Sequence, residues 1–374
     1  MRDQSKNKSR WLSVFAALSA SLLVLNAAAT TTGTFLDRIN DQDVRVAAYN
    51  LGGFIANDSG FVISGAGNAV TFTPPNARVM RAIDADVWAF QEIDNLSAFQ
   101  VAEALDQAAP LSDGGTWHAH RDAGQVIASR FPIRSVVTNV PGDPREPAIA
   151  TIDLPDTQYT RDLHILNLHL KARSGSSNEA RRLASVDFLI DYLEDTRNPA
   201  ASRGLPDRTP IIALGDYNTA SGNAPVENLA NGNYTNNTRF GPDAPPDWDG
   251  TPLTIVEARH NVAGLDTFTF RNGNTRSRLD WIAYTDSVLT LAQAFVLNTT
   301  GMSSPDLAAA GLERRDIVFD TDSSRWDHLP VVADYQLSAF VIPEPTVASW
   351  IVCFIACGTK RRVRITLVES RLPA

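Results

Sequence analysis

Residues 211–218 have the sequence IIALGDYN, a short apolar run that ends in a polar turn. A run of four to eight apolar residues bounded by turn residues is typical of a fully buried β-strand. Asp216 and Asn218 follow this run one residue apart, so both side chains can point to the same side of an extended segment. An apolar strand holds such groups rigidly at the rim of a sheet. We therefore expect Asp216 and Asn218 to belong to a functional site at a sheet edge.

The same arrangement recurs along the chain, because several predicted strands have polar residues of catalytic type at one end. These are Asn50 after the strand at 44–49, Gln91 and Glu92 after 86–90, His169 in 164–170, Asp280 in 279–283, and Asp327 and His328 before 331–335. Each residue alone could be a turn cap or a buried, hydrogen-bonded core residue. Six such strand ends in one chain favour a functional site.

The remaining pattern predicts a protein with many strands and few helices. Further strands are expected at 124–129, 133–140 and 148–154, and helices at 76–83, near 96–108 and at 178–193. Residues 52–74 are rich in Gly, Asn, Ser and Thr, and we expect a loop there; residues 221–250 are dense in Asn, Gly, Pro and Asp, and we expect a surface excursion. With no internal repeat and no linker, this pattern predicts two sheets packed face to face with helices outside.

The ordered motifs YN, QE, NLHL, GDYN, RLDW and WDHLP resemble those of the endonuclease/exonuclease/phosphatase superfamily, which has the DNase I-like fold. The resemblance covers residues 43–338. It implies an α/β fold, namely a four-layer α/β sandwich of two packed, mostly antiparallel β-sheets flanked by helices. It also implies a divalent-metal phosphoesterase site at one rim.

The resemblance implies a metal site and assigns its ligands. Glu92 would bind a divalent metal, Asn50 would support that site, and Asp327 would ligate a second metal. Carboxylate and amide oxygens suit a hard cation, so we expect Mg²⁺, with Mn²⁺ or Ca²⁺ as alternatives.

The catalytic roles implied by the resemblance fall on five residues. Asp216 would act on the attacking water and Asn218 would contact a phosphate oxygen. His328 would be general base or phosphate donor, oriented and charge-stabilised by Asp280, and His169 would face the phosphate from the other half of the molecule. Either histidine is a candidate for the proton transfer.

Basic residues near the predicted site indicate the class of substrate. Arg145-Glu146-Pro147 resembles the same stretch in secreted DNase I-like nucleases, which implies that Arg145 contacts the nucleic-acid backbone. Lys171, Arg173 and Arg182 follow His169 and could add positive charge near the site, but we interpret them as solvated surface residues. We predict a nuclease. The alternatives are a sphingomyelinase-type phospholipase or inositol-phosphate phosphoesterase, and a catalytically inert surface binding module.

The two ends of the chain resemble targeting segments. Residues 1–29 combine a basic start, an apolar stretch and an Ala-Ala-Ala cleavage site, which is typical of a secretory signal peptide. Residues 342–364 contain Pro343-Glu344-Pro345, an apolar run and a basic cluster, and resemble a PEP-CTERM sorting tag. We therefore expect an exported, extracellular or cell-surface monomer, transiently associated with the membrane through this segment and processed by an exosortase-type protease.

Charge and cysteine content exclude some classes of site. Between residues 30 and 345 the chain has 24 basic and 40 acidic residues, a net charge of −16. This charge disfavours a protein that coats nucleic acid non-specifically, because such binding depends on neutralising phosphates. Both cysteines, Cys353 and Cys357, lie beyond this part, so it contains neither a thiol nucleophile nor a cysteine-ligated zinc. No G-x-S-x-G elbow is present, which argues against a serine hydrolase.

Overall fold

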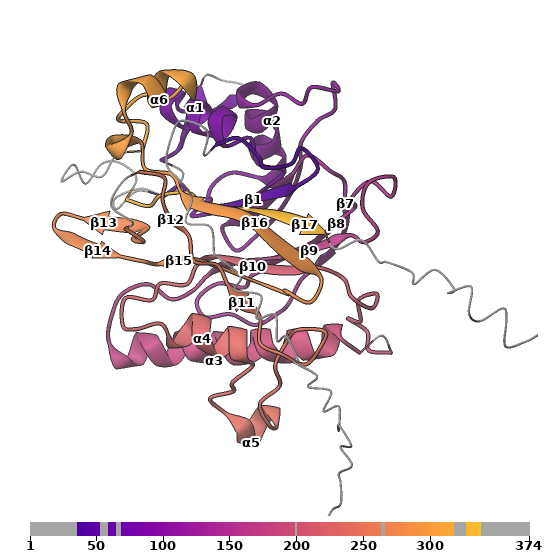
Figure 1. Cartoon of the computed structure of the whole chain (residues 1–374). Coiled ribbons are helices and arrows are strands. Elements are labelled where there is room, and N and C mark those ends of the chain that lie inside the picture. Colours follow the sequence, from indigo (N-terminus) through magenta and orange to yellow (C-terminus); the bar gives the residue numbers. More distant parts are fainter. Residues whose placement is uncertain are drawn as a thin grey trace, which may run out of the picture.

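Two mixed β-sheets pack face to face at the centre of the molecule (Figure 1). The computed structural model describes residues 36–52, 59–64, 69–198, 200–262, 266–317 and 327–337. The two predicted targeting segments, 1–29 and 342–364, lie outside these residues.

The strands divide between the sheets as follows. In spatial order, the seven-stranded sheet contains β12 (Arg259–His260), β16 (Leu289–Val296), β17 (Val331–Leu337), β1 (Val44–Asn50), β4 (Val87–Gln91), β6 (Gln125–Ser129) and β5 (His118–Asp122). The six-stranded sheet contains β11 (Thr254–Ile255), β15 (Asp280–Tyr284), β10 (Ile211–Asp216), β9 (Leu163–His169), β8 (Ala148–Ile152) and β7 (Ile133–Val137). Two hairpins stand apart from them: β2 (Phe61–Ser64) with β3 (Ala69–Phe72), and β13 (Phe270–Asn272) with β14 (Thr275–Ser277).

Helices cover the outer face of each sheet (Figure 1). On the side of the seven-stranded sheet lie α1 (Pro74–Ile83), α2 (Ala98–Ala108), the 3₁₀ turn η1 (Thr299–Gly301) and α6 (Ser304–Ala309). On the side of the six-stranded sheet lie α3 (Ser176–Thr196) and α4 (Ala224–Asn231), with the short α5 (Asn237–Phe240) beyond them. This arrangement confirms the predicted four-layer α/β sandwich. Among the described residues, no helix has both the length and the apolar character that crossing a bilayer requires.

Parallel strand pairs at the centre of each sheet bring the polar strand ends together. β1 pairs in parallel with β4, with Asn50 opposite Gln91, and β9 pairs in parallel with β10, with His169 opposite Asp216. β15 runs antiparallel to β10, so its first residue, Asp280, lies opposite Asp216. β17 runs antiparallel to β1, so the residues that precede β17 reach the same edge. One edge of the sandwich therefore collects the polar ends predicted from the sequence.

A buried amide pair joins the two sheets directly beneath this edge. Gln91 Nε2 donates to Asn167 Oδ1 at 2.7 Å, and Asn167 Nδ2 donates to the carbonyl oxygens of Phe90 and Val126 at 2.8 and 3.0 Å. Both amides are fully buried. Gln91 and Asn167, which lie inside the QE and NLHL motifs, therefore fix the sheets relative to each other.

The structure corrects the predicted loops. Residues 52–74 include the hairpin β2–β3, which the rings of Phe61 and Phe72 join by stacking with centroids 4.5 Å apart. These two strands were not predicted, because each has only four residues and the surrounding sequence is rich in turn-forming residues. Residues 221–250 include α4 and α5. α4 was missed because Asn and Pro dominate its surroundings, although its Pro225 occupies the first turn, where proline is tolerated.

Candidate active site

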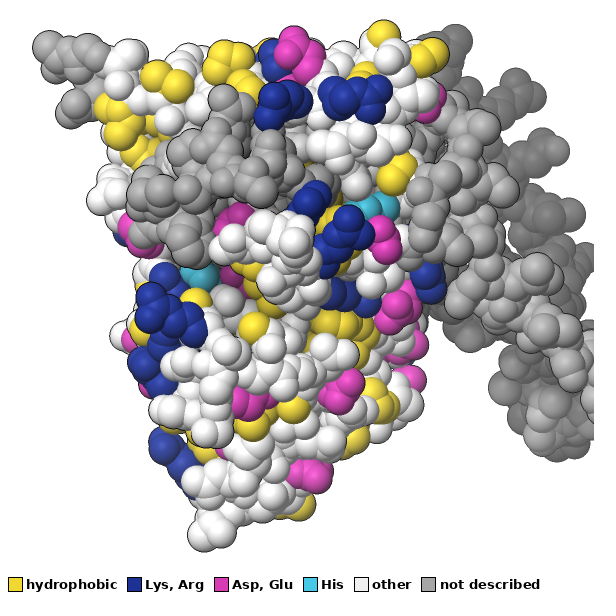
Figure 2. All heavy atoms as spheres, turned by 90° about the vertical axis from the view of Figure 1, so that its left-hand side faces the viewer, with side chains coloured by type: hydrophobic (Ala, Val, Ile, Leu, Met, Phe, Trp, Pro, Cys, Tyr) yellow, Lys and Arg dark blue, Asp and Glu magenta, His cyan; other side chains and the backbone are white. Residues whose placement is uncertain are grey.

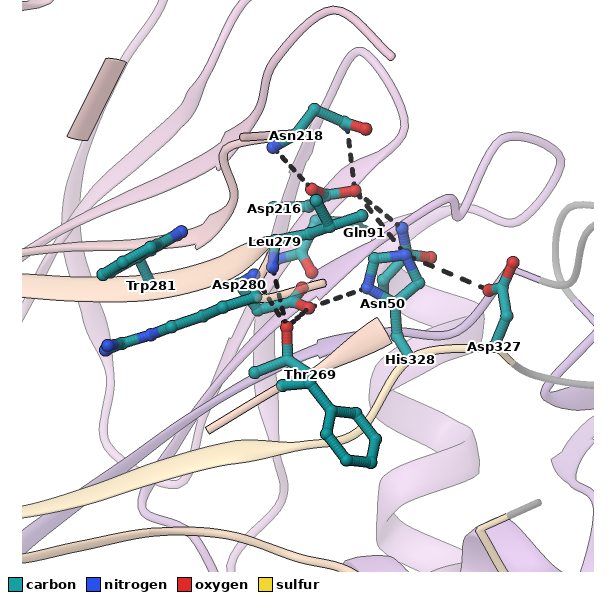
Figure 3. A network of polar contacts seen from close by, with 12 residues as sticks. Asn50, Gln91, Asp216, Asn218, Thr269, Leu279, Asp280, Trp281, Asp327 and His328 are labelled. Atoms are coloured by element: carbon teal, nitrogen blue, oxygen red, sulfur yellow. Dashed lines mark hydrogen bonds and ion pairs between the residues drawn. The ribbon is translucent and has the colours of Figure 1, made fainter. Parts of the chain in front are cut away.

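Eight of the nine predicted site residues lie at this edge, and Figure 3 shows their central group. They are Asn50, Glu92, His169, Asp216, Asn218, Asp280, Asp327 and His328. The seven-stranded sheet supplies Asn50 and Glu92, and the six-stranded sheet supplies His169, Asp216 and Asp280. The site thus lies across the packing interface of the two sheets.

Asn50 connects two of the carboxylates. Its Nδ2 donates to Glu92 Oε1 at 3.1 Å and to Asp216 Oδ2 at 3.3 Å, and its Oδ1 accepts from the backbone N–H of Gly52 at 3.0 Å. Glu92 has a φ of 62°, which is unusual for a residue with a side chain. A Cβ at Gly52 would lie 1.6 Å from Glu92 Oε2, so the glycine leaves the space that the carboxylate occupies.

Asp216 is fully buried and accepts hydrogen bonds from Asn218. The backbone N–H of Asn218 donates to Oδ1 at 2.8 Å, and its Nδ2 donates to Oδ2 at 3.0 Å. Asn218 itself has a φ of 50°, and its Nδ2 also reaches the carbonyl oxygen of Leu170. Burial raises the pKa of Asp216 to about 7, with Asp280 and Glu92 adding to the rise and His328 opposing it. This carboxyl group therefore exchanges protons near neutral pH.

His328 and Asp280 form a buried pair. His328 Nδ1 lies 2.8 Å from Asp280 Oδ2, and His328 Nε2 lies 3.8 Å from Asp216 Oδ2. Burial alone would lower the pKa of His328, but Asp280, Asp216 and Asp327 outweigh it and raise the pKa well above the usual value. His328 is therefore an imidazolium whose Nε2–H is directed into the site.

His169 has the opposite character. Its Nε2 lies 3.6 Å from Asp216 Oδ2 and 3.8 Å from Glu92 Oε1. Burial, followed by the positive charges of Arg145, His328 and Lys171, lowers its pKa well below the usual value, so the ring is neutral. Among the described residues its buried Nδ1 has no hydrogen-bond partner. The two predicted histidines therefore differ in charge.

Asp327 borders the same space. Its Oδ1 lies 3.9 Å from His328 Nε2, and its backbone oxygen accepts from the N–H of Arg271 at 2.9 Å. Burial raises the pKa of Asp327, and Glu92 and Asp280 contribute to the rise, whereas His328 lowers it. The mutual repulsion of these carboxylates indicates a site with excess negative charge.

The donor set fits a divalent cation. Ligand atoms of Asp216, Asp280 and His328 lie within 4.8 Å of one another, the spacing of a metal site. However, the Asp280–His328 hydrogen bond already occupies one atom of each residue, so we assign the ligands differently. Glu92, Asp327 and the Asn50 amide, the ligands expected from the sequence, carry oxygen donors of the kind that Mg²⁺ prefers.

Arg145 and Arg182 lie beside this group. Arg145 lines a small pocket with His169, Gly142 and Pro141, so the ninth predicted residue borders the site. Arg182 contradicts the prediction of a solvated surface residue, because it is fully buried. Its guanidinium pairs with Glu179 at 2.5 Å and donates to backbone oxygens, which accounts for the burial of its charge.

Thr269 is a residue that the sequence analysis missed. Its Oγ1 donates to Asp280 Oδ2 at 2.6 Å and accepts from the backbone N–H groups of Leu279 and Asp280 (Figure 3). Next to it, the ring of Phe270 packs edge-on against that of His328 with centroids 5.1 Å apart. The segment FTF at 268–270 has no catalytic residue type, so only its position ten residues before RLDW could have drawn attention to it.

The chain can now be compared with known proteins. The profile of the Endonuclease/Exonuclease/phosphatase family matches residues 47–304, more than half of the chain. Among solved structures, the human Nocturnin catalytic domain is 15% identical with a TM-score of 0.44, covering 79% of this chain and 95% of that one. Sphingomyelinase C from Streptomyces griseocarneus is 16% identical with a TM-score of 0.43, covering 78% and 99%.

A mannosyl-6-phosphatase from Bacteroides thetaiotaomicron is 17% identical with a TM-score of 0.45, covering 79% of this chain and all of that one. No curated protein matches the chain. The profile match covers the strands that carry Asn50, Glu92, His169, Asp216 and Asp280. The chain therefore belongs to the endonuclease/exonuclease/phosphatase family of phosphoester hydrolases.

Proposed function

We propose that this protein is a Mg²⁺-dependent phosphodiesterase that hydrolyses the phosphodiester bonds of nucleic acids. The observation that carries the proposal is the contrast between neighbouring ionisable groups at the sheet edge. A charged His328, a neutral His169 and a carboxyl group with a pKa of about 7 all surround one space. Groups whose pKa values are pushed apart in this way are typical of acid–base catalysis.

Each of these groups has a role in attack on a phosphodiester. Ionised Asp216 accepts a proton from water and so generates the nucleophile, for which a pKa near neutrality is suitable. His328, oriented by Asp280, donates a hydrogen bond to a phosphoryl oxygen through Nε2. His169 and Asn218 position the phosphate from the six-stranded sheet. A divalent cation held by Glu92, Asn50 and Asp327 would neutralise charge on the phosphoryl oxygens.

The choice of nucleic acid rests on the charge around this edge. Figure 2 shows the face to the left of Figure 1, where β13 and β14 lie; both basic and acidic side chains lie beside the histidine side chains visible there. Arg145, which borders the site, presents a planar guanidinium that matches phosphate oxygens bidentately. Basic groups around a phosphoesterase site favour a polyanionic substrate.

One observation favours a second candidate, a phospholipid phosphoesterase of the sphingomyelinase type. β2 follows β1 closely and exposes two apolar side chains, Val62 at 43% and Ile63 at 56%. Exposed apolar residues on a hairpin can insert into the surface of a membrane. The substrate assay must therefore include a lipid.

The proposal is tested with the full chain on plasmid DNA, RNA, sphingomyelin vesicles and bis-p-nitrophenyl phosphate, each with Mg²⁺, Mn²⁺ or EDTA. We expect metal-dependent cleavage of DNA or RNA, reduced about 10²- to 10⁴-fold in His328→Ala, the range for loss of an acid–base group. His118→Ala, a partly exposed histidine on the edge strand β5, is the matched control and retains activity. Turnover of sphingomyelin alone would support the second candidate. No turnover of any substrate would leave an inert binding module.

We also propose that the protein is exported as a monomer, with residues 1–29 removed and residues 342–364 serving as a transient membrane anchor that an exosortase-type protease releases. The apolar and basic segments described from the sequence support this proposal. Mass spectrometry of the protein recovered from the producing cells tests it, because two intact ends would contradict the processing. Sedimentation of the same sample tests the monomer.

A further inference from the structure

We propose that Lys171 and Arg173, together with Arg145, form a second phosphate subsite beside the reacting phosphate. The preferred substrate is then an oligonucleotide with a phosphate group adjacent to the scissile one. This inference rests on the proposed phosphodiesterase function and specifies its substrate. Three features of the structure support it: the placement of lysine, a buried clamp beneath the loop, and a facing loop that carries Arg145.

Lysine is used at one place in the folded part of the chain. The sequence contains four lysines, Lys6, Lys8, Lys171 and Lys360, so Lys171 is the only one between residues 9 and 359. It lies two residues after His169, where β9 leaves the sheet. Elsewhere in this span every basic residue apart from histidine is an arginine. The lysine therefore stands at the rim of the active site.

A buried arginine holds the loop that carries Lys171 and Arg173. Arg182, on α3, donates from Nη1 to the carbonyl oxygens of both residues, at 2.6 and 2.9 Å. Its other guanidinium nitrogens are held by Glu179 and by the hydroxyl of Ser221. Because Arg182 is fully buried, it fixes the backbone of the loop from the protein interior. The side chains of Lys171 and Arg173 remain accessible to solvent.

A second loop, residues 141–147, lines a small pocket together with the end of β9, and Leu170 in this lining directly precedes Lys171. The pocket is lined by Arg145, Gly142 and Pro141 from the loop and by His169 from the sheet. The loop is tied to α3, because Asp143 pairs with Arg181 and its backbone N–H donates to Ser185 Oγ at 2.9 Å. The loop that carries Arg145 is thus anchored beside His169 and Leu170, next to the start of the Lys171 loop.

The cations on these two loops lie close enough to repel one another. Partial burial, then the charges of Arg181, Arg173 and Arg145, lower the pKa of Lys171, and Asp143 opposes them. Arg181 is paired with Asp143, but among the described residues neither Arg145 nor Arg173 is within 4 Å of a carboxylate. Like charges held together by a rigid scaffold disfavour the empty site and favour an anion between them.

The position of this cluster specifies the substrate class. His169 links the two groups of residues, because its Nε2 lies 3.6 Å from Asp216 Oδ2 and it lines the pocket with Arg145. A second phosphate on the same chain would fill the space near Lys171. A phosphodiester with a cationic choline headgroup would instead be repelled there, since like charges destabilise each other.

The first experiment measures binding to Lys171 without any turnover. The full chain, in EDTA, is treated with an amine-reactive acetylating agent, and the acetylation of each lysine is followed by mass spectrometry of its peptides. We expect saturating thymidine 3′,5′-bisphosphate to slow acetylation of Lys171 about tenfold, the effect of one charge-assisted hydrogen bond, and thymidine, which carries no phosphate, to leave it nearly unchanged. Lys6, Lys8 and Lys360 serve as internal controls. Equal protection by the bisphosphate and by thymidine, or protection by neither, would overturn the phosphate subsite.

The second experiment uses dinucleotides that differ by one phosphate. The ratio of kcat/KM for pTpT or TpTp to that for TpT should be about ten or more in the wild-type protein and close to one in Lys171→Gln/Arg173→Gln. Arg161→Gln, an exposed arginine at the other end of β9, should keep the wild-type ratio. A ratio that the double variant leaves unchanged contradicts the proposal. If no dinucleotide is hydrolysed, the phosphodiesterase proposal fails, whereas the acetylation experiment still decides the subsite.

Discussion

Two residues in the active site, Glu92 and Asn218, have left-handed backbone conformations with φ values of 62° and 50°. Such conformations cost free energy for residues with side chains, and they persist where the surrounding structure holds them. Glu92 directs its carboxylate over Gly52 and toward Asn50, and Asn218 turns its amide back onto Asp216. At the scale of single residues, the site is therefore fixed by backbone turns as much as by side chains.

Gly52→Ala should disable the site without unfolding the protein. The new Cβ would lie 1.6 Å from Glu92 Oε2, and the carboxylate is flexible enough to move away. Because a displacement of about 1 Å at a catalytic group can cost about 100-fold, we expect kcat/KM to fall by that order while the thermal midpoint changes little. Gly115→Ala, in an exposed loop, is the control. Full activity in Gly52→Ala would show that the position of Glu92 is not critical.

Thr269→Val tests the hydrogen bond that orients Asp280. The change keeps the shape of the side chain but removes the donor that lies 2.6 Å from Asp280 Oδ2. We expect kcat to fall about 10- to 100-fold, as is typical for loss of an orienting partner. The pH dependence of kcat should also shift, because the Asp280 carboxylate that pairs with His328 is then held less firmly. Thr269→Ser restores the hydroxyl and should recover most of kcat. Identical pH profiles for wild type and Thr269→Val would limit Thr269 to a structural role.

At the scale of elements, the sequence predicted the buried central strands, which are rich in apolar residues, and missed β5 and β16. β1, β4, β9 and β10 are buried along their whole length, so their composition alone identifies them. β5, with the sequence HAHRD, is a half-buried edge strand and carries no apolar pattern. The polar ends of central strands could be predicted as a site, because parallel pairing brings them together.

The sequence could not show which residues make the hydrogen bonds that hold the site residues and the neighbouring loop in place. Thr269 belongs to the segment before the β13–β14 hairpin, and its contact with Asp280 depends on how the chain folds back after β12. Arg182 has the composition of a surface residue, and only the packing of α3 against the loop at 171–173 explains its burial. These contacts join segments that no local pattern relates.

A buried histidine couples α3 to the six-stranded sheet and makes stability depend on pH. His164 on β9 bonds to Thr151 Oγ1 at 2.9 Å and to the hydroxyl of Tyr192 on α3 at 2.8 Å. Burial lowers its pKa to about 3. The folded protein therefore keeps the ring neutral, whereas the unfolded chain takes up a proton below its ordinary pKa of about 6.5. The free energy of unfolding should fall as the pH drops from about 6.5 toward 3, and it should be unaffected above 6.5.

This coupling predicts a loss of about 2 kcal/mol from His164 alone at pH 5, since each pKa unit corresponds to about 1.4 kcal/mol. Urea unfolding at pH 7.5 and pH 5 measures it, with His164→Gln as comparison. The variant lacks the titrating ring, so its free energy of unfolding should fall less between the two pH values than that of the wild type. Equal falls in both proteins would place the acid sensitivity elsewhere.

At the scale of the whole molecule, the active site is part of the contact between the two sheets. Asn50 and Glu92 come from one sheet, Asp216 and His169 from the other, and the Gln91–Asn167 pair joins the sheets beneath them. A ligand that bridges these residues therefore stabilises the packing of the sheets, and its binding free energy is added to that of folding.

Divalent cations should accordingly raise the thermal midpoint. Burial, together with repulsion between the carboxylates, raises the pKa values of Asp216 and Asp327, and a cation offsets both effects. Each 1 kcal/mol of binding should add about 1–2 °C in a protein of this size. Differential scanning fluorimetry with Mg²⁺, Mn²⁺ and EDTA measures the shift. Glu92→Gln should abolish most of it, whereas Glu103→Gln, exposed on α2, should retain it. An equal shift in both variants would place the cation outside the active site.

The position of β17 has a consequence for the order in which the molecule is completed during synthesis. The chain builds β1, β4, β5 and β6 first, then the six-stranded sheet between residues 133 and 284, with the two-residue strand β12 of the first sheet inside this span, and it adds β16 and β17 last. β17 lies between β16 and β1, and His328 lies just before it. A ribosome-bound chain that ends before residue 328 thus lacks both the centre of one sheet and the imidazolium of the site. The proposed phosphodiesterase activity depends on His328, so a nascent chain gains it only after β17 and the residues just before it have been added.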